Sequence, residues 1–155
     1  MKESIGSTWL FGIVITFIVL FASIVSMSVN WSRAYKVKDE IIFNIENTHG
    51  FNADTMTTIN EYMRRVGYRS VGDCPEKYCG FSINSDISNK WNNGSNFCVK
   101  RVDVETGPGD IASSYYSVVV FFKLDMPVLG NILKLDVSGE TAKITKPRDF
   151  DDFSC

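Results

Sequence analysis

The sequence has 155 residues, enough for one ordinary domain of roughly 100–150 residues and one further element of about 20. Its 16 basic and 18 acidic residues give a net charge of -2, and the two signs are mixed along the chain. Because the sequence has no basic stripe that could neutralise phosphates, nucleic acid is not an expected partner.

The first predicted element is an apolar helix at Trp9–Val29, WLFGIVITFIVLFASIVSMSV, which contains no ionisable residue. A helix of this length covers about 31 Å, which matches the roughly 30 Å hydrocarbon core of a bilayer. A cleavable signal peptide is the alternative, but its apolar region is usually about 7–15 residues long and ends at a small-x-small site, which fits poorly here. We therefore expect a short tail at 1–8 and an uncleaved single-pass anchor in the lipid bilayer at 9–29.

The anchor pattern continues as an amphipathic rod at 30–50. Apolar residues recur there at spacings of three and four, as expected of one face of a helix: Ala34, Val37, Ile41 and Ile45. We expect this stripe to pack on the domain's own sheet, with Lys38 on the opposite face. Gly50 suits a left-handed helix cap, so the whole helix is predicted to run from about residue 7 to 47.

The rest of the chain, 51–155, is predicted to be an α+β domain. A second, short helix is expected at Ala53–Val66, with Asn52 or Asp54 as its N-cap and Gly67 as its stop. The region 68–96 is irregular and rich in Gly, Ser, Asn and Asp, and one or two short strands are considered within it, such as 68–71.

Three strands are predicted in the last third of the chain. Phe97–Glu105 alternates in polarity, which places Cys98 on the inward side. Tyr115–Leu124 is almost continuously apolar and β-branched or aromatic, as expected of a central strand packed on both faces. In Ile132–Thr145 the apolar parity changes, which suggests a bulge at Gly139. The sequence therefore predicts a long helix packed on a small antiparallel sheet.

All four cysteines, Cys74, Cys79, Cys98 and Cys155, lie downstream of the anchor. An even number in a small extracytoplasmic domain predicts two disulfides. Four buried thiols in a cytosolic domain are an alternative, and a zinc site is less favoured because no CxxC pair is present. Three pairings are open. We favour Cys74–Cys98 with Cys79–Cys155, because together they join the irregular region and the C-terminal tail to the sheet.

The charges beside the anchor point to the opposite orientation. Lys2 and the terminal amine precede the anchor, whereas Arg33, Lys36 and Lys38 follow it, which mildly favours a cytoplasmic domain. The bias is small because the tail is short and two acidic residues follow at 39–40. We give the cysteines more weight and expect the domain outside the cytoplasm.

Residues that could carry catalysis are not arranged for it. His49 is the only histidine and lies in the turn that ends the long helix. The acidic tail at 149–152 is expected to be solvated, and the GPG sequence at 107–109 lacks the following helix of a phosphate loop. We therefore expect neither an enzyme nor a cofactor or metal site.

Small residues inside the apolar run lie at spacings that allow helices to approach closely. These residues are Gly12, Thr16 and Ser23. They suit lateral assembly into a homo- or hetero-oligomer, although ordinary tolerance of small hydroxyl residues in a spanning helix explains them equally well.

The order of these parts resembles the type IV pilin-like proteins, and most closely the TadE-like pseudopilins of tight-adherence pilus systems. The resemblance is carried by KESIGSTWLFGIVITFIVLFASIVSMSVNWSRAYKVKDEI at the front and by YYSVVVFFKLDMPVLGNILKLDVSGETAKI at the back. It implies a structural subunit that an assembly machine extracts from the membrane into a filament of pilin-like subunits. In that family a glutamate near the N-terminus neutralises the terminal amine of a neighbouring subunit, and Glu3 is the matching residue.

Two other interpretations stay open. The chain could be a membrane-anchored extracellular binding module whose irregular region recognises a ligand through Tyr78, Phe81 and Trp91. It could also be an accessory protein of an envelope secretion or competence machine that does not polymerise. Surface filaments containing a tagged chain would separate the pilin interpretation from both.

Overall fold

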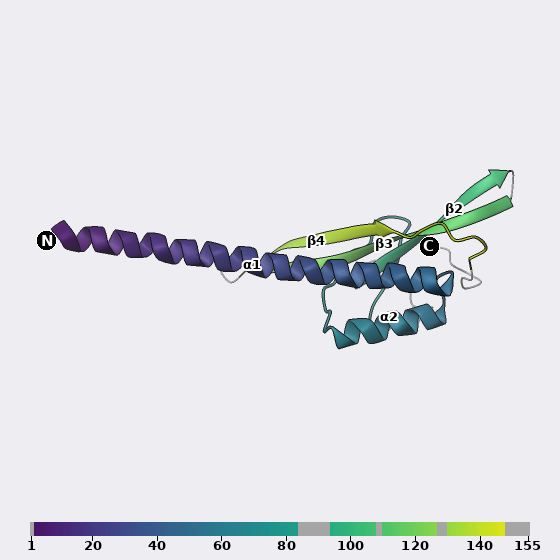
Figure 1. The fold of residues 1–155 in the computed structure, drawn as a ribbon, viewed down its shortest axis with the longest axis horizontal. Helices are drawn as coiled ribbons and strands as arrows, with labels where there is room; N and C mark the ends of the chain where they lie inside the picture. The colour runs from purple at the N-terminus through teal and green to yellow at the C-terminus, as the bar shows by residue number, and fades with distance from the viewer. Residues whose placement is uncertain (1, 84–93, 108–109, 127–129, 148–155) are drawn as a thin grey trace.

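The computed structural model describes residues 2–83, 94–107, 110–126 and 130–147, and it confirms the α+β class. Two helices and one four-stranded antiparallel sheet make up this part of the chain (Figure 1). The helices are α1 (Lys2–Thr48) and α2 (Ala53–Arg65), and the strands are β1 (Cys79–Phe81), β2 (Phe97–Gly107), β3 (Asp110–Met126) and β4 (Gly130–Glu140). The strands lie in the order β1-β2-β3-β4, so each is antiparallel to its neighbour in sequence.

The long helix α1 is continuous and begins at Lys2, earlier than the residue 7 predicted. No proline interrupts residues 2–8, so nothing there stops the helix. At its other end the left-handed residue is His49, with φ 58°, and not Gly50 as predicted. The Gly50 N–H donates to the Ile45 carbonyl at 3.0 Å and the His49 N–H to the Glu46 carbonyl at 3.2 Å, which is a Schellman cap.

The short helix α2 begins at Ala53 as predicted and ends at Arg65, with Val66, the last predicted residue, as its C-cap. Asn52 is the N-cap, and its side chain accepts the Thr55 N–H at 3.0 Å in a capping box. At the C-terminal end Gly67 has φ +65°, the left-handed conformation that a Schellman cap requires. The Tyr68 N–H then donates to the Met63 carbonyl at 2.9 Å. Local sequence signals are therefore sufficient to define this helix.

Strand β3 is central, as predicted, because it pairs with β2 on one side and β4 on the other. Its residues of even number, such as Tyr116 and Val118, face the helices, and Val119 and Phe121 face the other way. Both sets are buried. The continuous apolar sequence of this strand therefore reflects cover on both faces of the sheet.

The prediction that Cys98 of β2 points inward is confirmed, although the sequence did not say which face of the sheet it lies on. Cys98 is fully buried, but it lies on the face of the sheet away from the helices, in contact with Val119 and Phe121. Its neighbours Phe97 and Val99 point into the core between sheet and helices. Alternation of charge in the outer half of the strand did not predict that Phe97 and Val99 are buried as well, because only the inner half of the strand is covered on both faces.

The end of β4 also differs from the prediction. Gly139 pairs with Val118 in regular register, so the predicted bulge is absent there. A Cβ at Gly139 would lie 2.9 Å from the side chains of Ile42 and Lys38, so the glycine allows α1 to approach the strand closely. The change of parity occurs at Thr141, where the side-chain hydroxyl accepts the Tyr116 N–H at 2.9 Å in place of a carbonyl.

One short strand, β1, does form in the region 68–96, but not at 68–71, the position given as an example. Gly72 makes an isolated bridge with Ser95 instead. The three residues of β1 are all buried and pair with β2, Phe81 opposite Phe97. A strand this short carries no periodicity that a sequence pattern could show.

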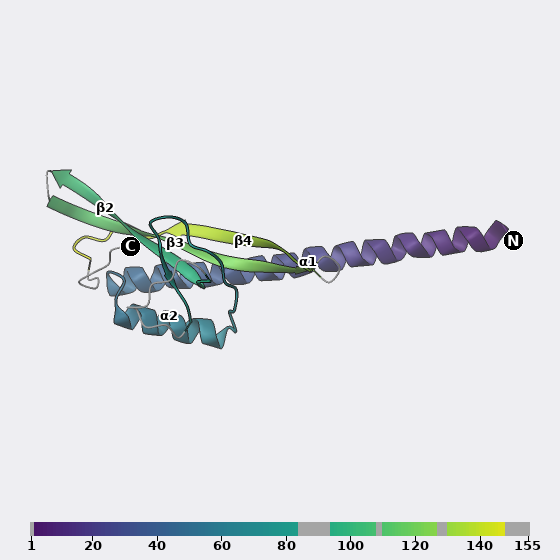
Figure 2. The same ribbon diagram turned by 180° about the vertical axis from the view of Figure 1, so that it is seen from behind.

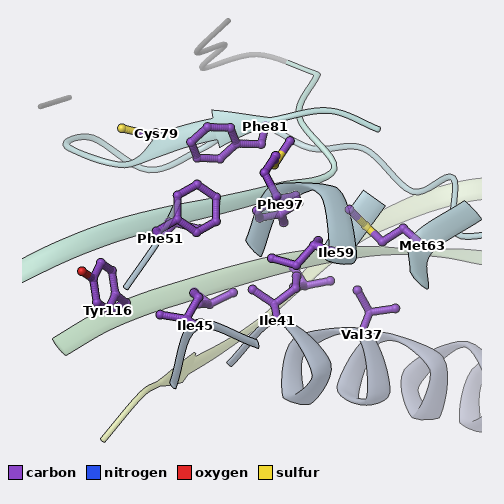
Figure 3. Close-up of a cluster of buried hydrophobic side chains, with 14 of the residues drawn as sticks. Val37, Ile41, Ile45, Phe51, Ile59, Met63, Cys79, Phe81, Phe97 and Tyr116 are labelled. Carbon is purple, nitrogen blue, oxygen red and sulfur yellow. The ribbon is translucent and has the colours of Figure 1, made fainter. Parts of the chain in front are cut away.

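The main core lies between the two helices and one face of the sheet (Figure 3). Val37, Ile41 and Ile45 project from α1 toward Ile59 of α2 and Phe97 of β2. Three phenylalanines close the end of the core that lies away from the anchor; they are Phe51, Phe81 and Phe97, with ring centroids 4.9 to 6.4 Å apart. The long helix is therefore part of the domain core over its second half.

Candidate functional site

The most conspicuous surface of the molecule is the N-terminal half of α1, which extends beyond the domain (Figures 1 and 2). Its large apolar side chains are exposed all round the helix: Trp9, Leu10, Phe11, Ile13, Val14, Ile15, Phe17, Ile18, Leu20, Phe21, Ile24, Val25 and Val29. This is one helix long and apolar enough to cross a membrane, and none of its most apolar window is buried. A helix apolar on every side needs cover from lipid or from other helices.

Aromatic side chains mark both ends of this exposed segment. Trp9 is 74% exposed and Trp31 is 45% exposed. They are separated by about 33 Å along the helix at roughly 1.5 Å per residue, close to the thickness of a hydrocarbon core. Trp31 also stacks on Phe122 of β3 with centroids 6.5 Å apart. Tryptophans concentrate at membrane interfaces, so this spacing is consistent with a membrane anchor whose far boundary lies at the start of the domain.

The predicted assembly residues form a shallow notch on this surface. A Cβ at Gly12 would meet nothing within 4 Å, so the missing side chain leaves an open groove. The groove is lined by Thr8, Trp9, Gly12, Ile13, Thr16, Phe17 and Leu20. The Thr16 hydroxyl donates to the Gly12 carbonyl at 2.9 Å, and the Ser23 hydroxyl donates to the Val19 carbonyl at 2.9 Å. Because their hydroxyl protons are used within the helix, these residues allow close approach and can only accept hydrogen bonds from a neighbouring helix. Glu3 lies in the first turn of α1, and its side chain lies outside the described residues.

The predicted packing stripe lies in the second half of α1. Ala34, Val37, Ile41 and Ile45 are all at most 1% exposed. Ala34 packs against Phe122 and Val137, and the other three belong to the main core. Lys38 was expected on the opposite face, but its side chain is only 14% exposed and its ammonium lies 2.9 Å from Asp39. Its position three residues before Ile41 puts it beside the stripe.

The notch and the packing stripe lie on the same side of the helix. At about 100° per residue, Ile41 is rotated only about 20° from Gly12, and Ala34 about 40°. The side of α1 that carries the sheet in its second half is therefore the side that carries small residues in its first half. A helix that docks in the notch would therefore lie on the same side of α1 as the chain's own domain, but nearer the N-terminus.

The irregular region is held on the far face of the sheet by a disulfide. Cys74 and Cys98 are bonded with an S–S distance of 2.01 Å, which confirms the first favoured pair. Cys79 is also disulfide-bonded. Cys155 lies outside the described residues, and the pair Cys79–Cys155 stays a prediction. The buried Asn96 side chain adds two bonds, to the Ser70 carbonyl and from the Ile83 N–H, both at 2.8 Å.

The sequence did not predict a second surface, a cleft between α1 and the segment that follows α2. Its lining includes Arg33 and Lys36 from α1 together with Tyr68 and Arg69. These residues are brought together by the return of α2 along α1. The pair of cations at Arg33 and Lys36, one turn apart, was the available signal, but nothing in the sequence placed Arg69 beside them.

The described residues contain no group of three His, Cys, Asp or Glu side chains that could hold a metal ion. His49 is exposed, and its Nδ1 lies 3.3 Å from the Asn47 carbonyl in its own turn. Within this part of the chain the arrangement offers surfaces for lipid and protein contact.

Comparison with protein families, with characterised proteins and with solved structures finds no match to this chain.

Proposed function

We propose that this chain is a membrane-anchored, pilin-like structural subunit, of the TadE-like pseudopilin kind, in a bacterial surface filament or its assembly complex. The observation that carries the proposal is the division of α1. One 47-residue helix is exposed and apolar in its first half and buried by its own sheet in its second. A subunit built in this way can leave the membrane only if other helices replace the lipid around its first half.

The notch supports close helix–helix contact in such an assembly. Within a bilayer, helices associate through packing at small residues, because lipid tails are as apolar as the side chains. Gly12 and Thr16 provide that geometry, and the bulky Trp9, Phe17 and Leu20 beside them would fit against a neighbouring helix. The same residues serve both a membrane dimer and a filament core.

The disulfide supports a location outside the cytoplasm. Disulfides persist in oxidising compartments and are rare in the cytosol. The Cys74–Cys98 bond holds a loop across the far face of the sheet, against Val119 and Phe121. An alkaline phosphatase fusion after Cys155 tests the orientation, because that enzyme needs its own disulfides. Phosphatase activity of this fusion in intact cells agrees with the proposal. An inactive fusion that gains activity only when the anchor is engineered to insert in the opposite orientation contradicts it.

Polymerisation is tested by immunogold electron microscopy of cells that express an epitope-tagged full chain. We expect gold along surface filaments. Gly12→Leu, which fills the notch, should reduce incorporation, whereas Val14→Leu on another side of the helix should not. A tag confined to the cell membrane in filament-bearing cells would contradict the subunit proposal and favour a non-polymerising accessory protein or an anchored binding module.

A further inference from the structure

The cleft between α1 and the segment after α2 lies where the domain meets the exposed half of the helix. It has a volume of about 110 Å³, room for several waters or a small polar headgroup. Its lining residues are Asn30, Arg33, Lys36, Val37, Tyr62, Val66, Gly67, Tyr68, Arg69, Ser70 and Phe122. The lining thus combines three cations with apolar side chains and contains no carboxylate.

The three cations of the cleft are not neutralised by the domain. Among the described residues, Arg33, Lys36 and Arg69 form no ion pair, although Lys38 on the same helix pairs with Asp39 at 2.9 Å. Three exposed positive charges around one concave site attract an anion, and guanidinium groups match the oxygen geometry of a phosphate. The charge of the cleft is therefore complementary to a phosphate group.

The cleft also contains a buried hydroxyl without a hydrogen-bond partner. Tyr68 is 7% exposed, and its hydroxyl has no partner among the described residues. The Ser70 side chain lies near enough to lower the pKa of this phenol, but burial is the larger effect. Burial raises the pKa of the Tyr68 phenol, so the group stays protonated and can donate. A buried donor left unsatisfied is costly, and a ligand oxygen in the cleft would remove that cost.

The position of the cleft along α1 sets its depth relative to the membrane. Arg33 lies about 6 Å beyond Val29, the last residue of the apolar run, and Lys36 about 10 Å beyond it. Helix α2 runs back along α1, so the segment at 66–70 reaches the same level (Figures 1 and 2). The polar layer of a bilayer is about 5–8 Å thick on each side. Arginine side chains at this level reach lipid phosphates directly.

We propose that this cleft binds the phosphate-bearing headgroup of an anionic phospholipid, from the leaflet that borders the domain. Arg33, Lys36 and Arg69 contact the phosphate oxygens, and the Tyr68 hydroxyl donates to one of them. Phe122 and Val66 contact the glycerol and the start of the acyl chains. The proposal depends on the anchor but not on polymerisation or on the orientation of the domain. It also gives the cations after the anchor a role other than setting topology.

Native mass spectrometry of the full chain in a neutral maltoside detergent tests the proposal. With added phosphatidylglycerol we expect one tightly bound lipid, and with phosphatidylcholine at the same concentration none. Arg33→Gln with Arg69→Gln should weaken phosphatidylglycerol binding about tenfold or more, since charge-assisted hydrogen bonds to phosphate are lost. The matched control is Arg64→Gln with Arg65→Gln, which removes two arginines from the nearby end of α2 that do not line the cleft. It should change binding less than twofold.

Equal loss of binding in the two double variants would overturn the proposal, because it would show diffuse attraction to surface charge. Tyr68→Phe keeps the fold and removes only the hydroxyl, so it should weaken binding severalfold, whereas wild-type affinity would overturn the placement of the phosphate beside Tyr68. Inorganic phosphate alone tests the source of the ligand. A thermal shift equal to that given by phosphatidylglycerol would show that the cleft binds soluble phosphate and would overturn the lipid assignment.

Discussion

The two halves of α1 share one continuous helical backbone but differ in every other respect. The first half exposes large apolar side chains all round, whereas the second buries one stripe of apolar side chains in the domain core and exposes few others. In the second half Phe43 is the large apolar side chain most exposed, at 60%. Hydropathy alone therefore does not say whether a helix packs on its own chain; the angular distribution of the apolar residues does.

The comparison teaches how one helix serves two environments. The stripe in the second half repeats at three and four residues, because only one side meets the sheet. The first half shows no such selection, because none of its most apolar window is covered by the domain. The notch at Gly12 and Thr16 departs from this uniformity, and it lies on the side of the helix that faces the sheet further along the chain.

The largest expected effect comes from a charge placed in the buried stripe. Ile41→Asp should unfold the domain, because an unpaired buried charge costs several kcal/mol against a typical stability of about 5–15 kcal/mol. The matched control is Phe43→Asp, two residues away on the solvent side, which should change stability by about 0.5 kcal/mol or less. Thermal unfolding of the full chain in detergent, followed by near-ultraviolet circular dichroism, measures both. Equal melting temperatures would show that the stripe is not a contact within the chain.

An aspartate in the first half of α1 should impair membrane insertion and leave the stability of the domain unchanged. Ile18 is 61% exposed. Ile18→Asp should reduce the carbonate-resistant membrane fraction, because aspartate at the centre of a spanning helix costs about 2.5–3.5 kcal/mol in insertion. The melting temperature of the domain in detergent should stay at the wild-type value. A lowered melting temperature would show that the anchor half contributes to the domain core.

The domain and the exposed half of α1 also differ in how they tolerate a methyl group at glycine. A Cβ at Gly72 would lie 2.3 Å from the Phe121 ring, so Gly72→Ala should destabilise the domain by about 1–3 kcal/mol through overpacking. Gly12→Ala meets open space and should leave domain stability unchanged. Chemical denaturation gives both values. Combining Gly72→Ala with Phe121→Leu should restore part of the lost stability, because the smaller side chain leaves room for the added methyl group. If no stability is restored, the backbone at Gly72 and not the Phe121 ring causes the destabilisation.

The smallest effect concerns the end of α1. His49 has φ 58°, a conformation that costs an L-residue and that glycine adopts freely. His49→Gly should therefore stabilise the domain by about 0.5 kcal/mol, after the greater unfolded-state entropy of glycine is included. Gly67→Ala, at the equivalent position of α2, should destabilise it by about 1 kcal/mol. For each variant, the change in stability is measured as a shift of the denaturation midpoint with an unchanged dependence of the unfolding free energy on denaturant concentration. A destabilised His49→Gly variant would mean that the imidazole contributes contacts to the turn.

Much of the fold could be predicted because its signals are local. The anchor, the stripe from Ala34 to Ile45 and the caps at Asn52 and Gly67 each depend on a few consecutive residues. The central position of β3 followed from its continuous apolar sequence. Predictions that needed partners distant in sequence were incomplete, such as the face of the sheet on which Cys98 is buried and the bounds of strand β1, or wrong, such as the bulge at Gly139.

The sequence by itself determined that a long apolar helix continues as an amphipathic one and that a small cysteine-containing α+β domain follows, because periodicity and hydropathy are properties of adjacent residues. Only the tertiary structure decided which face of β2 meets the helices, that Gly139 serves close approach and not a bulge, and that Arg69 joins Arg33 and Lys36 around one cleft. These outcomes depend on how α2 and the irregular segment pack back across α1 and the sheet, and such long-range contacts leave no pattern along the chain.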